Sequence, residues 1–290
     1  MTDRYVVIGN PIAHSKSPMI HADFARQLDV DLQYCKLFSP MNGFEQTVKM
    51  LQAAGVKGAN VTVPFKQEAW RLAQKPSAAV QFAQAANTLR FGTDGIEADN
   101  TDGIGLCTDL NRLLQLQGQQ LSGATVVMLG AGGAASGCVS AFKDAGVAEL
   151  FVLNRTVDKA VDLAVKANGI GLKAHGLSLS SECSVMTSST HKVVLVNASS
   201  SSLSGQAVPI SNEWFQSACL AYDMMYAQQP TPFMKQALGV NPEASVADGL
   251  GMLVFQAAAA FEFWTGLKPH AADTLARMRN TLQIKQEASA

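Results

Sequence analysis

The feature that most constrains this chain is an apolar run followed at once by a glycine-rich turn. Residues 124–129 read as a buried strand, and residues 130–135 separate that strand from a helical pattern that continues to about Ala145. Between a strand and a helix, a G-x-G-x-x-A turn is the fingerprint of a dinucleotide-binding site, because its backbone can approach the pyrophosphate and helix and strand can pack closely. The predicted phosphate-binding residues are Gly130, Ala131, Gly132, Gly133 and Ala134.

The end of the next strand indicates which dinucleotide is bound. The strand at 149–153 runs into Asn154-Arg155-Thr156, where an NAD site usually places an acidic residue against the ribose 2′-hydroxyl. Arg155 instead offers a planar cation to a 2′-phosphate, and Lys159 adds positive charge one turn into the following helix. Asp158 could bind a ribose hydroxyl by another route. The sequence therefore predicts a preference for NADP over NAD.

The rest of the chain alternates between strand-like and helical patterns. Before the glycine turn, strands are predicted at 5–8, 33–38, 58–63, 87–91 and 96–99, and helices at 18–28, 44–54, 67–73, 78–86 and 104–117. After the dinucleotide unit, strands are predicted at 192–197 and 220–223, and two terminal helices at 249–264 and 271–284. This alternation predicts an α/β protein, in which ligands usually bind at the carboxyl ends of the strands.

Two of the predicted strand ends carry polar side chains that fit a small polar ligand. Asn60, Thr62 and Lys66 are separated by even numbers of residues and so fall on one face, at and just beyond one strand, which the intervening proline should end. An exposed strand end with a solvated lysine would show the same spacing. Ser17 is predicted to cap the first helix, whereas Ser15, in the loop before it, has no such local role.

Composition narrows the class of partner. The 290 residues carry a net charge of −1, so no overall field attracts nucleic acid or an anionic membrane. Five scattered cysteines without a C-x-x-C pair argue against a disulfide framework, and the histidines lack acids or cysteines at ligand spacing, so no metal is predicted. A strand-like run directly after the first residues predicts that there is no signal peptide. We expect a cytoplasmic protein that binds small molecules, with a homodimer left open.

Nine motifs, in order over nearly the whole chain, carry a family resemblance. They are Gly9–Pro18, Asn60–Lys66, Ala86–Leu89, Asn100–Gly103, Gly130–Ala134, Asn154–Thr156, Tyr222–Tyr226, Thr231–Phe233 and Asp248–Val254. On these motifs the chain resembles the shikimate dehydrogenases. The resemblance implies a reversible, NADPH-linked reduction of 3-dehydroshikimate to shikimate, a step of chorismate and aromatic amino acid biosynthesis.

The resemblance also implies a domain organisation and a set of site residues. A mainly parallel α/β substrate domain (1–104 plus 249–290) would be completed by the C-terminal helices, and a Rossmann-type NADP domain would span 105–248. By position, Lys66 and Asp102 would form the catalytic pair, and Met224 and Gly249 would lie against the nicotinamide. The residues that would bind the substrate are Ser15, Ser17, Asn60, Thr62, Asn87, Tyr226 and Gln256.

The chemistry suits these residue types, although other interpretations stay open. Lys66 can exchange a proton with the substrate oxygen, because desolvation favours its neutral form while Asp102 favours the ammonium and can orient it. The serine- and threonine-rich run after Asn197 is longer and looser than the family pattern. A paralogue that oxidises quinate as well as shikimate is one alternative. The other alternative is a regulatory protein that binds the cofactor but has lost catalytic activity. The presence of both Lys66 and Asp102 weighs against it.

Overall fold

The computed structural model describes residues 2–182, 192–199 and 201–287, and the chain divides into two compact units. Unit 1 comprises residues 1–105 and 253–278, and unit 2 comprises residues 106–252 and 279–290. The boundaries fall inside three helices, α5 (Asp102–Gln115), α10 (Leu250–Thr265) and α11 (Ala271–Glu287). In the part of the chain that the structure describes, no helix combines the length and apolar character needed to cross a membrane.

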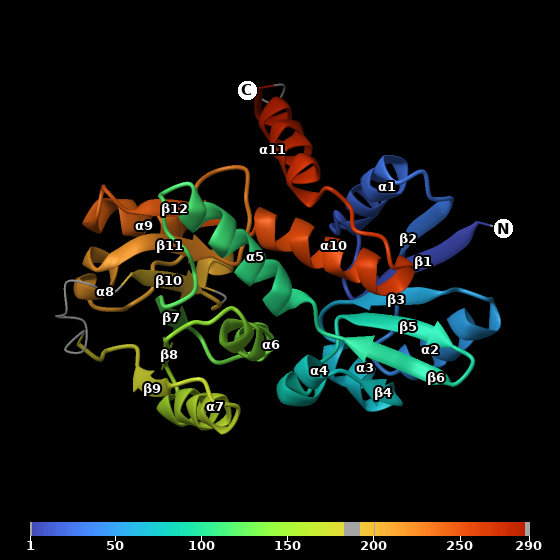
Figure 1. The fold of residues 1–290 in the computed structure, drawn as a ribbon, viewed down its shortest axis with the longest axis horizontal. Helices are drawn as coiled ribbons and strands as arrows, with labels where there is room; N and C mark the ends of the chain where they lie inside the picture. Colours follow the sequence, from blue (N-terminus) through green and yellow to red (C-terminus); the bar gives the residue numbers. More distant parts are fainter. Residues whose placement is uncertain (1, 183–191, 200, 288–290) are drawn as a thin grey trace. The chain divides into compact units, whose positions relative to one another are not determined.

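Unit 1 is built on a six-stranded mixed sheet with the strand order β2-β1-β3-β5-β6-β4 (Figure 1). Strand β1 pairs in parallel with β2 and β3, and β4 pairs in parallel with β6, whereas β5 runs antiparallel to β3 and β6. The strands are β1 (Asp3–Gly9), β2 (Leu32–Phe38), β3 (Gly58–Val61), β4 (Lys75–Pro76), β5 (Thr88–Gly92) and β6 (Gly95–Asp99). The helices between them are α1 (Ser17–Gln27), α2 (Phe44–Ala53), α3 (Lys66–Leu72) and α4 (Ala78–Ala83).

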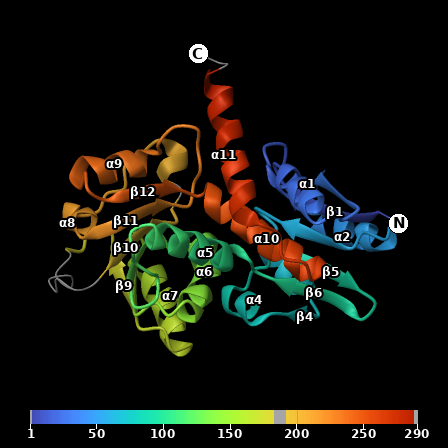
Figure 2. The ribbon, with the colours of Figure 1, turned by 45° about the horizontal axis from the view of Figure 1, so that its top comes forward.

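The C-terminal helices complete unit 1 through specific contacts, and Figure 2 shows α10 running over the β5–β6 side of its sheet. Trp264 of α10 donates its indole N–H to the carbonyl of Leu89 (2.9 Å) and stacks on Tyr5. A side chain at Gly58 would lie 2.7 Å from that indole nitrogen, so glycine is needed there. On α11, Arg277 forms an ion pair with Asp23 of α1 (2.6 Å).

Unit 2 is built on a six-stranded parallel sheet with the order β12-β11-β10-β7-β8-β9, which is the order of a doubly wound Rossmann sheet. The strands are β7 (Thr125–Leu129), β8 (Glu149–Asn154), β9 (Ala174–Ser178), β10 (Val193–Asn197), β11 (Ala218–Asp223) and β12 (Ser245–Asp248). The helices that complete the unit are α6 (Gly133–Asp144), α7 (Val157–Gly169), α8 (Asn212–Gln216) and α9 (Pro232–Val240), and a 3₁₀ turn, η1, spans Ser201–Ser204.

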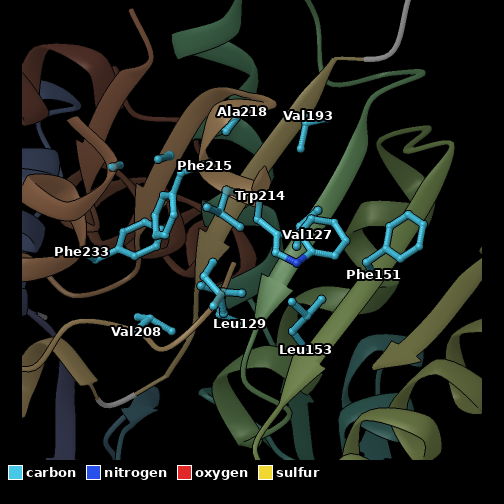
Figure 3. Close-up of a cluster of buried hydrophobic side chains, with 14 residues drawn as sticks. Val127, Leu129, Phe151, Leu153, Val193, Val208, Trp214, Phe215, Ala218 and Phe233 are labelled. Atoms are coloured by element: carbon cyan, nitrogen blue, oxygen red, sulfur yellow. The ribbon is translucent and has the colours of Figure 1, made fainter. Parts of the chain in front are cut away.

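The core of unit 2 explains why its central strands read as continuous apolar runs. All five residues of β7 and of β10 are buried, as expected for parallel strands covered on both faces. Figure 3 shows the cluster of buried hydrophobic side chains in unit 2, in which Trp214 lies near the strand residues Val127 and Phe151. The fully buried Trp214 donates its indole N–H to the carbonyl of Ser181, so its one polar atom is satisfied.

Several elements differ from the sequence-based expectations. The predicted strand at 58–63 ends at Val61, and Lys66 is the first residue of α3, so strand alternation does not place Lys66 beside Asn60. The short strands β4, β9 and β12 were not predicted. Strand β9 lacks an apolar run and contains Gly176, where a side chain would lie 2.4 Å from the backbone nitrogen of Val161. The Ser/Thr-rich segment at 178–190, for which the sequence predicts no element, lies partly outside the described residues.

Candidate active site

The glycine turn in unit 2 has the geometry of a phosphate site. Gly130 follows β7 with φ of +109°, a conformation that L side chains rarely adopt, and an added side chain would lie 3.2 Å from the backbone of Ala198. At Gly132 and Gly133 an added side chain would meet nothing within 4 Å. Helix α6 begins there without a side-chain cap, so its first N–H groups are available to an anion. The turn therefore fits a dinucleotide pyrophosphate.

The end of β8 supplies exposed positive charge. Asn154 donates from its side chain to the carbonyl of Thr156 (2.8 Å), which shapes the turn into α7. Arg155 and Lys159 are exposed, and neither forms an ion pair with another described residue. A free guanidinium beside the strand end fits a 2′-phosphate, as predicted for NADP.

The remaining predicted cofactor residues follow the same row of the sheet. The residues paired in register at the ends of β7, β10, β11 and β12 are Leu129, Asn197, Asp223 and Asp248. Met224 and Gly249 come directly after this row. A side chain at Gly249 would lie 2.1 Å from the carbonyl oxygen of Met224, so the two backbones can approach only because of this glycine. Tyr226 follows on the same turn, and burial raises its pKa, with a further rise from Asp248.

In unit 1 the proposed catalytic pair is in direct contact. The ammonium Nζ of Lys66 lies 2.5 Å from Oδ2 of Asp102, the first residue of α5. The second carboxylate oxygen accepts from Nδ2 of Asn87 (2.8 Å). The carbonyl of Lys66 also accepts from the backbone N–H of Ala86 (2.8 Å), which ties the start of α3 to the segment before β5. Both carboxylate oxygens therefore have donors, and the lysine is aimed by its partner.

Asn87 is the centre of the polar cluster in unit 1. Its Oδ1 accepts from the backbone N–H of Thr101 (2.9 Å) and from the hydroxyl of Thr88 (2.9 Å), which fixes the orientation of the amide. Its Nδ2 therefore faces Asp102 and Oε1 of Gln256 (3.3 Å). Gln256 in turn donates to the carbonyl of Leu253 on α10 (2.8 Å). The cluster joins residues that are up to 169 positions apart in the sequence.

Asn60 belongs to the same cluster through residues that sequence reasoning missed. The buried hydroxyl of Tyr34 donates to Oδ1 of Asn60 (2.7 Å), so the amide Nδ2 points to the hydroxyl of Thr88 (3.1 Å) and the carbonyl of Asn87 (3.2 Å). Thr88 lies within a motif that carried the family resemblance, but Tyr34 has no signal of its own in the sequence. Its partner lies on β3, which is separated from Tyr34 by β1 in the sheet.

Three of the residues predicted to bind the substrate carry hydroxyls: Ser15 and Thr62 lie in loops, and Ser17 begins α1. Ser17 does not cap α1 as predicted: it is the first helical residue, and its backbone N–H donates to Oγ of Ser15 (3.3 Å). Ser15 therefore does have a local role. The backbone N–H of Thr62 donates to the carbonyl of Ile8 (2.9 Å). A side chain at Gly9, the residue that ends β1 before Ser15 and Ser17, would lie 2.6 Å from the Thr62 methyl.

Comparisons with known proteins agree on one family along the chain. A family model described as the shikimate dehydrogenase substrate binding domain matches residues 7–89. Models described as shikimate / quinate 5-dehydrogenase and as the shikimate 5′-dehydrogenase C-terminal domain match residues 112–204 and 249–283. A curated relative from Herminiimonas arsenicoxydans, named shikimate dehydrogenase (NADP(+)), is 43% identical over 97% of this chain and 99% of its own length.

Solved structures agree with the sequence matches. An enzyme from Pseudomonas putida described as Ael1 superposes with a TM-score of 0.85 at 37% identity, covering 95% of this chain and 98% of its own. Shikimate 5-dehydrogenase from Thermus thermophilus, solved in complex with NADP(H) and shikimate, superposes with a TM-score of 0.78 at 31% identity, covering 96% of this chain and 100% of its own.

Proposed function

The chain belongs to the shikimate dehydrogenase family, and we propose that Lys66 and Asp102 are the pair through which it carries out the family reaction. It is an oxidoreductase that uses NADP, and its reaction is the reversible reduction of 3-dehydroshikimate to shikimate. The observation that carries the assignment of the pair is the 2.5 Å contact between Nζ of Lys66 and Oδ2 of Asp102.

The reduction of a ketone to an alcohol requires a hydride at carbon and a proton at oxygen. NADPH, when bound, supplies the hydride. Lys66 donates the proton to the oxygen as negative charge develops on it, and takes the proton back when shikimate is oxidised. Asp102 accepts a hydrogen bond from the ammonium of Lys66 and is itself held by Asn87, so it orients the lysine through the cycle.

Neutral donors suit the remaining polar groups of the substrate. The hydroxyls of Ser15, Ser17 and Thr62 can bind the ring carboxylate without a paired cation. The side chains assigned to the substrate hydroxyls are Asn60, Asn87, Tyr226 and Gln256. In support, Asn87 and Gln256 already contact each other in unit 1, and Asn87 contacts Asp102.

The two units divide the ligands between them in this proposal. Unit 1, which contains residues 1–104 and 253–278 of the expected substrate domain (1–104 plus 249–290), binds shikimate, and unit 2, which contains residues 106–248 of the expected NADP domain (105–248), binds NADP. The glycine turn and the free Arg155 support the second assignment. A cytoplasmic location fits a biosynthetic enzyme whose described cysteines are free and scattered. The proposal covers the single chain as well as a homodimer.

A second activity, oxidation of quinate, is favoured by one specific observation. The family model that matches residues 112–204 is described for both shikimate and quinate dehydrogenases. Lys66 and Asp102 would serve either substrate, because both present a ring hydroxyl to be oxidised.

The role of Lys66 is tested by steady-state kinetics of Lys66→Ala. We expect kcat to fall roughly 10²- to 10⁴-fold, as for a lost general acid–base, while the dissociation constant for shikimate changes little. The matched control is Lys49→Ala, which removes an exposed lysine of α2 that pairs with Glu45. A Lys66→Ala enzyme with normal kcat and a raised KM would make Lys66 a binding residue only.

A further inference from the structure

Two polar side chains end the central strands of unit 2 with no exposed surface. Asn197 closes β10 and Asp223 closes β11, they are paired in register, and both are 0% exposed. Neither is among the residues assigned above to the cofactor or the substrate. Buried polar groups need hydrogen-bond partners, so the partners show what these side chains hold in place.

The carboxylate of Asp223 is satisfied entirely by neutral donors from three segments. Its Oδ1 accepts from Nδ2 of Asn197 (3.2 Å) and from the backbone N–H of Met225 (3.1 Å), and its Oδ2 accepts from Oγ of Ser202 (2.5 Å). Among the described residues no cation lies within ion-pair distance of Asp223. Burying a carboxylate without a cation costs stability, and the three hydrogen bonds to Asp223 offset that cost. Packing alone therefore does not explain why this residue is an aspartate.

One arm of this network reaches the glycine turn. Ser199 donates to Oδ1 of Asn197 from its hydroxyl (2.6 Å) and from its backbone N–H (3.1 Å), and Ser202 donates to Asp223. Ser199 and Ser202, the ends of a segment that we call the serine loop, are therefore both held. The backbone of Ala198 and Ser199 lies 3.2 to 3.3 Å from the place a Gly130 side chain would occupy. The serine loop therefore packs directly against the proposed pyrophosphate turn.

The other arm reaches the residues proposed for the nicotinamide end. The N–H of Met225 binds Asp223, and the carbonyl of Met225 accepts from the N–H of Gly249 (3.0 Å). The N–H of Met224 donates to the carbonyl of Asn197 (3.0 Å). Asp223 and Asn197 thus connect the glycine turn, the serine loop and the turn from Met224 to Tyr226.

We propose that Asp223, supported by Asn197 and Ser202, is a positioning residue for NADP: it holds the serine loop against the glycine turn and fixes the Met224–Tyr226 turn. This inference rests on the proposed function in that the cofactor of unit 2 is NADP. It also gives a role to the serine-rich run that departs from the family pattern. Asp223 itself contacts neither cofactor nor substrate in this account.

Asp223→Asn tests the inference, because asparagine keeps the shape but turns one acceptor oxygen into a donor. We expect the dissociation constant for NADP, measured by titration calorimetry, to rise about tenfold or more, which is the usual effect of losing a hydrogen bond to a charged group. The dissociation constant for shikimate should change little, and the KM for NADP should rise more than kcat falls. The matched control is Asp109→Asn, which alters another buried carboxylate of unit 2, held by Arg112 and Tyr222.

Ser202→Ala provides a second, milder test that does not depend on how well Asp223→Asn folds. It removes one donor to Asp223, and we expect a rise of several-fold in the NADP dissociation constant that Ser202→Thr reverses. NADP affinities of Asp223→Asn and Ser202→Ala within about twofold of the wild type would overturn the inference and leave the proposed function intact. A wild-type protein that does not bind NADP would overturn both.

Discussion

Arg155 is the residue on which the choice of cofactor rests. It directly follows β8, it is exposed, and it has no ion-pair partner among the described residues. No acidic residue stands in its place to bind a ribose 2′-hydroxyl, and a guanidinium offers two parallel donors to a phosphate. The contribution of Arg155 to the binding free energy of the cofactor should therefore depend on the 2′-phosphate, which NADP has and NAD lacks.

Arg155→Ala should weaken NADP binding and leave NAD binding nearly unchanged. Losing a charge-assisted contact predicts a rise of roughly ten- to a hundred-fold in the KM for NADP. Lys166→Ala, which removes an exposed cation near the end of α7, the helix that begins two residues after Arg155, is the control for a general charge effect. Equal losses with NADP and NAD would show that Arg155 does not bind the 2′-phosphate.

The role of a single residue could be predicted from sequence where the residue belongs to a recognisable motif. It could not be predicted where its contact partner is distant in the sequence. Lys66 and Asp102 were paired by the family resemblance, and they are in contact. The reason first given for Lys66, even spacing along a strand, was wrong because α3 begins at that residue. Tyr34 could not be predicted, since its contact with Asn60 exists only once β1 has paired with both β2 and β3.

At the scale of elements, helix α1 packs on the rest of unit 1 through a histidine side chain. His21 is 0% exposed, stacks on Tyr34 with 4.2 Å between ring centroids, and is surrounded by further aromatic rings. Neither ring nitrogen has a hydrogen-bond partner of acceptable geometry. Burial lowers the pKa of His21 to about 3, and the nearby amide of Asn60 opposes this only in part. The histidine is therefore neutral in the folded protein.

This burial predicts that unit 1 loses stability in mild acid. Between the unfolded pKa of 6.5 and the folded value of about 3, the unfolded chain binds a proton that the folded chain excludes. The free energy of unfolding is therefore highest above pH 6.5. It declines as the pH falls, and at pH 5 it is lower by about 2 kcal/mol. Urea unfolding of the wild type and His21→Phe from pH 7.5 to 5, followed by tryptophan fluorescence, checks this.

The slope of stability against pH should be smaller in His21→Phe than in the wild type. His270→Ala, which removes an exposed histidine, should keep the wild-type slope. The same slope in all three proteins would mean that His21 does not titrate on unfolding as its burial requires.

Elements were predicted well where an apolar run or a helical period marks them. The strands of unit 2 at 124–129, 149–153, 192–197 and 220–223 are present as β7, β8, β10 and β11. Strands β9 and β12, which form the two edges of the sheet, were missed, because a half-buried edge strand needs no continuous apolar run. The cap expected at Ser17 was wrong by one helical position.

At the scale of the whole molecule, the α/β class and a Rossmann-type sheet were predictable, and the sheet of unit 1 was only partly so. Parallel β1, β2 and β3 follow from strands separated by helices. The antiparallel β5–β6 hairpin follows from its turn, Gly92 to Gly95. The division of the chain inside α5, α10 and α11 has no mark in the sequence, because a helix that serves two units keeps an unbroken period.

The activity of the chain as an NADP-dependent oxidoreductase for shikimate is best tested by a panel of four rates. The panel measures kcat/KM for shikimate and for quinate, each with NADP and with NAD. We expect the highest value for shikimate with NADP, well above the other three combinations. Equal values for quinate and shikimate, a preference for NAD, or no turnover with any combination would contradict it.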